Sequence, residues 1–271
     1  MQRAATKLTL SNFTASSLGA GALAVVVLGL VLTTITGCST ATREENKTKA
    51  SLHVQIGTTL FSNKKYPEAL SEFLQAEKLD PENATVHNNL ALTYFVRDRY
   101  DLSEKHIDRA IALDPKYTEA RNNRARILIE RKRYDEALEE AKRVIADLTY
   151  QHPIRGWINI ALAHFRKGDF QQAAKSATDA LKAERSNCFA QTILGRSLLE
   201  MGRLKQAALT LDRAIVACKA EGDDEAAYFS GFVHYKLGRS AAAVARLEAV
   251  IKEYPNGQYA ERAASLLEII K

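Results

Sequence analysis

Two consecutive stretches of the chain follow one pattern. Residues 50–83 read ASLHVQIGTTLFSNKKYPEALSEFLQAEKLDPEN, and residues 84–117 read ATVHNNLALTYFVRDRYDLSEKHIDRAIALDPKY. Each stretch has a small residue, a second small residue 12 positions later and a proline 12 positions beyond that. These are Gly57, Ala69 and Pro81 in the first stretch and Ala91, Ser103 and Pro115 in the second. A fixed period of 34 residues is typical of a repeat architecture.

The same pattern continues to the end of the chain. Units start at residues 50, 84, 118, 154, 188 and 224, so the spacing is 34 residues except at two junctions that are longer by two. One long junction contains Tyr150, His152 and Pro153, and the other contains Gly222, Asp223 and Asp224. We interpret both as loop insertions that leave the phase of the helices unchanged.

Each unit is predicted to form two amphipathic helices. In the first unit Leu70, Phe73 and Leu74 have the spacing of one helix face. The small residues Gly57 and Ala69 let the two helices approach closely. A single helix pair cannot bury its apolar stripe, so neighbouring pairs must stack. The sequence therefore predicts an all-α fold: a right-handed α-solenoid of six helix pairs over residues 50–271, with residues 258–271 as a C-terminal capping helix.

The period and the positions of the small residues resemble the tetratricopeptide repeat, over about 205 residues. The resemblance implies protein binding in a concave groove lined by the first helix of each unit. It places the following residues in that groove: Val54, Gln55, Thr58, Phe61, Asn88, Asn89, Leu92, Phe95, Asn122, Asn123, Arg126 and Ile129. Asn89 and Asn123 resemble the groove asparagines that hold a peptide backbone in this family. The alternative is that asparagine is simply common in the repeat.

The N-terminal segment is predicted to be a lipoprotein signal peptide. Residues 1–37 contain no acidic residue, include Arg3 and Lys7, and continue into an apolar run. The run ends in ITGC over residues 35–38, which resembles a bacterial lipobox. The resemblance implies acyl chains on Cys38, and Ser39 after it favours the periplasmic face of the outer membrane. The alternative is an uncleaved transmembrane helix. Residues 38–49 are polar, and we expect a flexible tether there.

The overall charge argues against nucleic acid as a partner. The chain has 38 Lys and Arg against 32 Asp and Glu, a formal charge of +6. Two of the basic residues lie in the signal segment. The positive charge that remains is too small to indicate a nucleic-acid-binding protein, in which basic residues form a strong clustered footprint. We expect a monomeric adaptor that binds protein.

Cys188 and Cys218 occupy positions 1 and 31 of the fifth unit. Antiparallel packing places the start of the first helix beside the end of the second, so a disulfide is sterically possible. It would contribute about 3–4 kcal/mol through loop closure, and an oxidising periplasm would favour it. The alternative is two buried free thiols.

The sequence contains no recognisable catalytic or metal-binding motif. The histidines have no HExxH spacing, and CxxC pairs, phosphate-binding glycine loops and GxSxG elbows are also missing from the sequence. The histidines are His53, His87, His106, His152, His164 and His234. We predict a binding module rather than an enzyme, with no metal and with no cofactor beyond the acyl chains.

A cluster of basic residues stands out in the third unit: Arg121, Arg124, Arg126, Arg131, Lys132 and Arg133. Arg124 lies where the repeat normally has a packing leucine, and such departures often mark function. Six acidic residues lie between positions 119 and 140, however, and they favour a helix surface of ion pairs. Trp157 is expected in the core.

A narrower resemblance comes from the segment that joins the third and fourth units. Asn122 and Asn123, then YDEAL over residues 134–138, ADLTYQHP over 146–153 and WIN over 157–159 are similar to the Tgl, PilW and PilF lipoproteins of type IV pilus biogenesis. The cysteine pair is closest to the Tgl branch. The chain departs from that family in having Arg124 and Ala125 after Asn123.

That resemblance implies a pilotin, an acylated adaptor that binds secretin subunits of the type IV pilus, brings them to the outer membrane and promotes their assembly into multimers. The alternative function is a lipoprotein scaffold of another envelope machine, such as cell-wall synthesis or outer-membrane protein assembly.

Overall fold

The computed structural model describes residues 42–271, which form α-helices joined by short turns. The N-terminal helix covers residues 42–62. The others are α2 (Tyr66–Leu79), α3 (Ala84–Phe95), α4 (Tyr100–Leu113), α5 (Thr118–Glu130), α6 (Tyr134–Ala146), α7 (Pro153–Lys167), α8 (Phe170–Ala183), α9 (Cys188–Glu200), α10 (Leu204–Cys218), a 3₁₀ turn (Lys219–Glu221), α11 (Glu225–Lys236), α12 (Ser240–Glu253) and α13 (Ala260–Ile270). The predicted signal segment and Cys38 lie outside the described residues.

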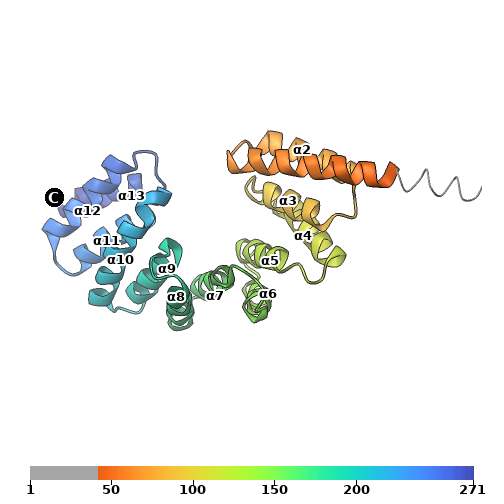
Figure 1. Cartoon of the computed structure of the whole chain (residues 1–271). Helices are drawn as coiled ribbons and strands as arrows, with labels where there is room; N and C mark the ends of the chain where they lie inside the picture. Colours follow the sequence, from red (N-terminus) through yellow and green to blue (C-terminus); the bar gives the residue numbers. More distant parts are fainter. Residues whose placement is uncertain (1–41) are drawn as a thin grey trace, which may run out of the picture.

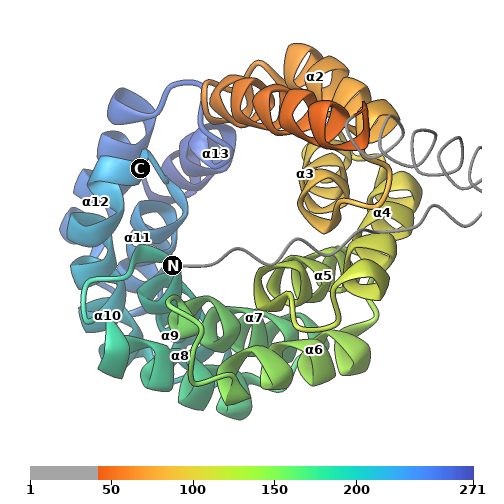
Figure 2. The same ribbon diagram turned by 45° about the vertical axis from the view of Figure 1, so that its right-hand side comes forward.

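Successive helices pair in antiparallel fashion and stack into a solenoid, as predicted from the period. Figures 1 and 2 show the stack curving round an open centre, with α3, α5, α7, α9, α11 and α13 on the inner side. Neighbouring inner helices contact one another all the way from α3 to α13. In the described part of the chain, no helix combines the length and the hydrophobicity required to span a bilayer.

The first helix begins earlier than the predicted start of the first repeat at residue 50. Residues 42–49, expected as part of a flexible tether, are helical and continue directly into the first repeat helix. Two ion pairs at helical spacing support this extension, Glu44 with Lys47 and Glu45 with Lys49. The expectation of a tether over these residues is therefore wrong, because the charges that suggested a solvated linker pair with one another along one helix.

In three of the repeats, the two helices touch through a glycine on the first helix and a large residue on the second. The pairs are Phe73 against Gly57, Leu211 against Gly195, and Leu247 against Gly231. A Cβ atom added at Gly195 would lie 2.6 Å from Leu211 Cγ. Ala125 instead packs in one cluster with the smaller Ala141. The summed volume of the two positions sets how closely the helices pack.

We expect Gly195→Ala to destabilise the fifth repeat by about 1–3 kcal/mol, because the added methyl group overlaps Leu211 in a well-packed core. Urea unfolding should show the loss. Leu211→Ala alone should cost about 2–5 kcal/mol through the cavity it leaves, and the double variant should lose less than the sum of the two single losses, since a smaller residue then faces the new methyl group, as in the Ala125 and Ala141 pair. Independent losses that simply add in the double variant would contradict this account of the pair.

The two cysteines of the fifth repeat form a disulfide. Cys188 at the start of α9 and Cys218 at the end of α10 are both fully buried, and their Cα atoms are 4.8 Å apart. Ala214 and Ala226 complete the cluster around them. The bridge joins the two helix ends that antiparallel packing brings together, as the sequence predicted.

Candidate protein-binding groove

Four of the residues predicted to line the concave groove come together at its N-terminal end. Thr58 and Phe61 of the N-terminal helix and Asn89 and Leu92 of α3 line one cavity of about 110 Å³, with Phe73 as its floor. The Phe61 ring packs edge-on against Tyr66, 5.3 Å between centroids. This cavity is small and mainly apolar, so it suits one apolar side chain of a partner.

Four other predicted groove residues are at least partly exposed, but they do not lie together. Val54 and Phe95 are half-buried and pack against core clusters of the first and second repeats. Gln55 is exposed and borders a shallow hollow with Leu52 on the N-terminal helix. Arg126 is exposed on α5 and lines a different cavity further along the inner wall.

The remaining four predicted groove residues are buried. Asn88, Asn122 and Asn123 are each no more than 5% exposed, and Ile129 lies in the core of the third repeat. The structure therefore corrects the expectation that these side chains face a partner. The inner helices contact one another directly, and residues at those contacts are covered by the next repeat.

The asparagines form a ladder of hydrogen bonds across the inner wall. Asn159 Nδ2 donates to Asn122 Oδ1 (2.9 Å), and Asn123 Nδ2 donates to Asn88 Oδ1 (2.9 Å). Longer contacts join Asn122 to Asn123 and Asn88 to Asn89. The side chains satisfy each other's buried donors and acceptors. The ladder holds α3, α5 and α7 in register, and Asn89 at its end lines the apolar cavity.

The basic cluster of the third repeat is a surface of ion pairs, as its acidic neighbours suggested. Glu140 on α6 is buried, and its carboxylate accepts hydrogen bonds from Arg121, Arg124 and Arg143 at 2.8–3.1 Å. Arg124 also reaches Asp108 on α4, 2.8 Å away. Arg124 therefore replaces the usual packing leucine with a charged link between the second and third repeats. Trp157 packs against the core cluster of the third repeat.

Two further arginines of that cluster have their own partners. Arg131 pairs with Asp101 at 2.8 Å, and Arg133 pairs with Glu136 at 2.6 Å and with Glu104. These pairs leave little of the cluster free for an external ligand. Two members differ: Lys132 is exposed and forms no ion pair among the described residues, and the Arg126 guanidinium, 3.7 Å from the Glu130 carboxylate, faces the inner wall.

A second cavity of the inner wall, which we call the arginine pocket, has a volume of about 350 Å³ and lies in the C-terminal half of the groove. Inner helices α5, α7, α9, α11 and α13 all contribute to it. Its lining residues are Arg126, Ile158, Leu162, Phe165, Arg166, Phe189, Thr192, Ile193, Arg196, Glu225, Gln258, Tyr259 and Arg262. Four arginines thus face a single carboxylate over an aromatic and aliphatic floor.

Arg196 is held rigidly at the centre of the arginine pocket. Its guanidinium lies between the rings of Phe165 and Phe229, 4.4 Å from each centroid, and forms an ion pair with Glu225. Tyr259 reaches the same carboxylate with its hydroxyl group. Burial and the charge of Glu225 raise the pKa of Tyr259 to about 12, so the hydroxyl stays protonated at neutral pH.

The peripheral arginines of the pocket are differently placed. Arg166 and Arg262 are exposed, and neither forms an ion pair within residues 42–271. The Arg262 guanidinium lies 5.4 Å from the Tyr259 ring. Phe189 is 51% exposed at the edge of the same cavity. The pocket therefore offers unpaired positive charge beside accessible aromatic surface.

The sequence contained a signal for this pocket. Ile158, Leu162 and Phe165 occupy the same repeat positions in the fourth unit that were assigned to the groove in the first three units. The same positions in the fifth unit hold Thr192, Ile193 and Arg196, whereas Phe189 lies at position 2. The repeat pattern could not predict that Arg262 of α13 lines the pocket, because the capping helix lies outside that pattern.

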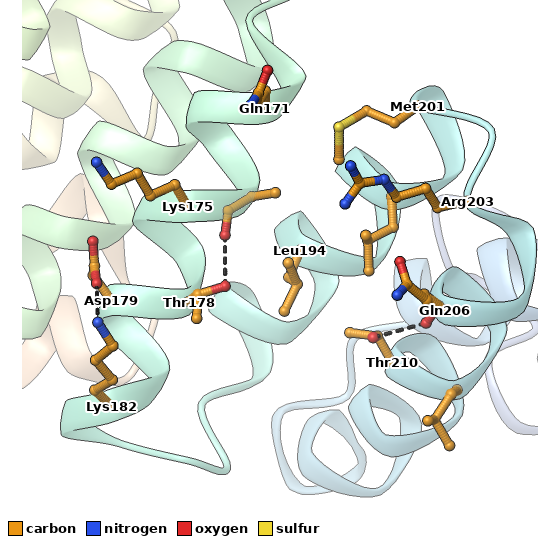
Figure 3. Close-up of a pocket in the computed structure, with 13 residues that line it drawn as sticks. Gln171, Lys175, Thr178, Asp179, Lys182, Leu194, Met201, Arg203, Gln206 and Thr210 are labelled. Atoms are coloured by element: carbon orange, nitrogen blue, oxygen red, sulfur yellow. Dashed lines mark hydrogen bonds and ion pairs between the residues drawn. The ribbon is translucent and has the colours of Figure 1, made fainter.

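The outer face has a hollow of its own, shown in Figure 3. It lies between α8 and α10, has a volume of about 600 Å³, and is lined by Lys175, Thr178 and Lys182 of α8 and by Gln206 and Thr210 of α10. Asp179 and Lys182 pair with each other there, 2.6 Å apart. The hollow is a wide furrow left by the divergence of outer helices, and its polar groups do not converge on one point.

The fold and the groove define a class of protein. Family models described as tetratricopeptide repeat match residues 93–151, 158–226 and 225–257, and one described as TPR repeat matches residues 57–96. The chain belongs to the tetratricopeptide-repeat proteins, whose solenoids act as scaffolds for protein–protein interaction. No curated protein matches the chain.

Solved structures share this fold at low sequence identity. PilW, described as a widely conserved type IV pilus biogenesis factor, is 19% identical with a TM-score of 0.71, over 79% of this chain and 98% of its own. Pseudomonas aeruginosa PilF is 20% identical with a TM-score of 0.65, over 82% and 99% of the two chains. A chain of the APC/C hetero-tetramer Cut9–Hcn1 is 16% identical with a TM-score of 0.71, over 82% and 43%.

Proposed function

We propose that the chain is a non-enzymatic outer-membrane lipoprotein adaptor, a pilotin, that binds type IV pilus secretin subunits and promotes their localisation and assembly into multimers. The observation that carries the proposal is the preformed inner wall, with its apolar cavity at one end and the arginine pocket at the other. A preformed groove binds a partner segment without a large ordering cost in the adaptor. The lipobox-like stretch at Cys38 and the likeness to PilW and PilF support it.

The arginine pocket indicates the chemistry of the segment that binds. Arginine forms strong bidentate hydrogen bonds with carboxylates, and the exposed ring of Phe189 adds apolar contact. We therefore expect a segment that combines acidic residues with an apolar or aromatic side chain. A basic segment would be repelled by Arg126, Arg166, Arg196 and Arg262.

Cys38→Ser should release the protein from membranes without unfolding it, because a single residue outside the repeats carries the proposed acyl anchor. Fractionation of cells should move the variant from the outer membrane to the soluble periplasmic fraction, whereas Ser39→Ala, the control, should stay bound. The circular dichroism of Cys38→Ser should match that of the parent. A Cys38→Ser protein that remains in the outer membrane would contradict the lipid anchor.

Deleting the gene should abolish secretin multimers in the outer membrane, and the parental gene should restore them. Persistence of the multimers would contradict the pilotin role. The alternative, a scaffold of cell-wall synthesis or outer-membrane protein assembly, predicts a different partner. Capture of the intact chain from detergent-solubilised membranes, followed by mass spectrometry, distinguishes the two: secretin supports the first, and wall hydrolases or assembly proteins support the second.

A further inference from the structure

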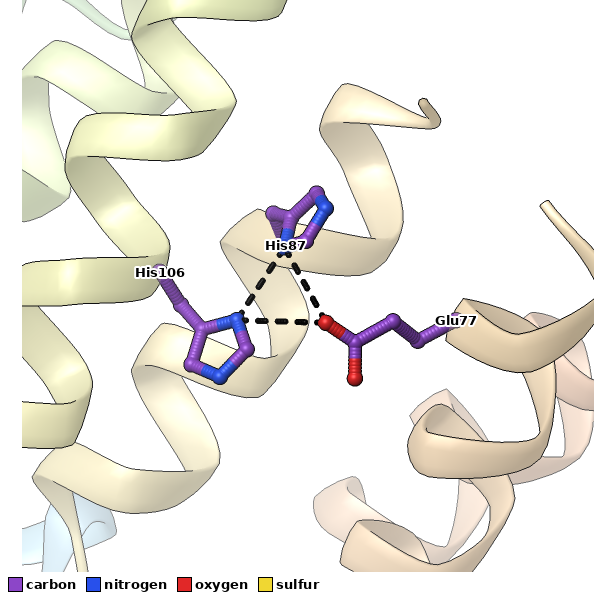
Figure 4. A group of neighbouring side chains, drawn as sticks. All are labelled: Glu77, His87 and His106. Carbon is purple, nitrogen blue, oxygen red and sulfur yellow. Dashed lines mark hydrogen bonds and ion pairs between the residues drawn. The ribbon is translucent and has the colours of Figure 1, made fainter. Parts of the chain in front are cut away.

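Three side chains with metal-binding atoms converge between the first and second repeats (Figure 4). Glu77 lies in the last turn of α2, His87 in α3 and His106 in α4. His87 Nδ1 is 3.0 Å from His106 Nδ1 and 3.7 Å from Glu77 Oε1. His106 Nδ1 is 3.9 Å from the same carboxylate oxygen. Three helices thus bring three donor atoms to one point.

The separations of these atoms fit the bond lengths of zinc. The circle through the three atoms has a radius of about 2.1 Å, so one ion can lie at the length of a zinc–imidazole bond from all of them. Two imidazoles and one carboxylate are a ligand set that zinc uses, with a fourth position left for water.

The second nitrogen of His87 orients the ring for this role. Nε2 lies 2.9 Å from the carbonyl oxygen of Pro81, and a hydrogen bond there requires the proton on Nε2. Nδ1 then carries the lone pair that a metal ion needs. A hydrogen bond from the outer ring nitrogen to a carbonyl is the usual support of a metal-bound histidine. The His87 side chain is 6% exposed, and the Tyr94 ring stacks on His106, 5.4 Å between centroids.

Comparison of the repeats singles out Glu77. It occupies position 28 of its unit, and the other five units have an aliphatic residue at that position: Ile111, Ile145, Leu181, Ile215 and Ile251. A carboxylate in place of a packing residue is a departure from the repeat pattern that packing alone does not explain.

The histidine pair is also unusual among the repeats. His87 and His106 occupy positions 4 and 23 of the second unit. In the first unit these positions hold His53 and Glu72, 2.6 Å apart, and in the third they hold Arg121 and Glu140, 3.1 Å apart. Those two pairs each contain their own carboxylate. The second unit has two histidines instead, and Glu77 from the preceding repeat supplies the carboxylate.

We propose that Glu77, His87 and His106 bind a zinc ion through Oε1, Nδ1 and Nδ1. The ion would link the second helix of the first repeat to both helices of the second. Because all three ligands come from different helices, metal binding would stabilise the packing of these helices and would also fix the N-terminal end of the groove. The apolar cavity lined by Thr58, Phe61 and Leu92 lies between the same two repeats.

Isothermal titration of the chelator-treated full chain in detergent, with Zn²⁺ alone as the probe, tests the site. We expect one ion per chain. Glu77→Ile and His106→Gln should each weaken binding by at least about 100-fold, since each removes a direct ligand. His53→Gln is the matched control, because it removes a histidine at the equivalent position of the first unit and should leave the affinity unchanged.

Glu77→Ile restores the residue type of the other five repeats, so it should fold, and circular dichroism of the metal-free variants checks this. Zn²⁺ should raise the Tm of the parent and of His53→Gln but not of Glu77→Ile. The visible spectrum of bound Co²⁺ should show low-coordinate geometry in the parent. Absence of binding by the parent, or equal affinities of parent, Glu77→Ile and His106→Gln, would show that the two histidines only hydrogen-bond to each other.

Discussion

Reversing the charge of two exposed arginines, Arg166→Glu with Arg262→Glu, should lower the affinity for the partner by at least about 100-fold. A hydrogen bond to a charged group contributes about 1.5–3 kcal/mol. Losing two such bonds therefore weakens binding by at least about 100-fold. Neither arginine pairs with a carboxylate within the described chain, so the substitutions break no internal ion pair. The reversed charges would also repel an acidic segment.

The measurement is fluorescence anisotropy with labelled peptides that span the periplasmic segments of the secretin. The matched control is Arg109→Glu with Arg213→Glu, which changes the net charge equally but lies on the outer helices α4 and α10. Equal losses in both double variants would mean that only overall charge matters. Unchanged binding by the pocket variant would contradict a role for the arginine pocket. A peptide set that fails to bind even the parent would instead count against the secretin as partner.

Replacing both cysteines of the fifth repeat by alanine should lower the free energy of unfolding by about 2–5 kcal/mol, because the open chain gains conformational freedom when it unfolds. The bridge spans 30 residues of sequence separation and lies fully buried beside Ala214 and Ala226. Urea unfolding of the oxidised parent and of Cys188→Ala with Cys218→Ala measures the difference.

The reduced parent is the control for packing in the disulfide prediction. It keeps both sulfur atoms but lacks the covalent link, so it should resemble the double variant more than the oxidised parent. Thiol labelling of the denatured, unreduced protein should find neither Cys188 nor Cys218 reactive. If both cysteines react, the bridge is absent from the protein, and the predicted loss of stability should disappear with it.

The fold was predictable because helix pairs of constant length recur with small residues at fixed positions. Gly57 and Ala69 are buried where the two helices of the first repeat meet, as the period predicts. The pairing of Gly195 with Leu211 was not foreseen, because it depends on the combined volume of two positions. The length of the first helix was also missed, since the charges of residues 42–49 suggested a linker rather than ion pairs along a helix.

The groove was only partly predictable. The repeat positions identified Thr58, Phe61, Asn89 and Leu92, which line one cavity. The same rule also selected Asn123, which the neighbouring inner helix covers. Position within a repeat specifies which way a side chain points, but the distance to the next repeat decides whether it is accessible. The convergence of Glu77, His87 and His106 was not foreseen, because its members come from two different repeats and match no contiguous motif.

Site-specific photo-crosslinking in native membranes tests most directly whether the inner wall binds another polypeptide. A photoreactive residue at position 189, where Phe189 is 51% exposed at the arginine pocket, is compared with one at position 216, where Val216 is 79% exposed on the outer helix α10. We predict an adduct with a second polypeptide from position 189 and none from position 216. Adducts from position 216 alone, or none from position 189, would contradict the proposed mode of binding.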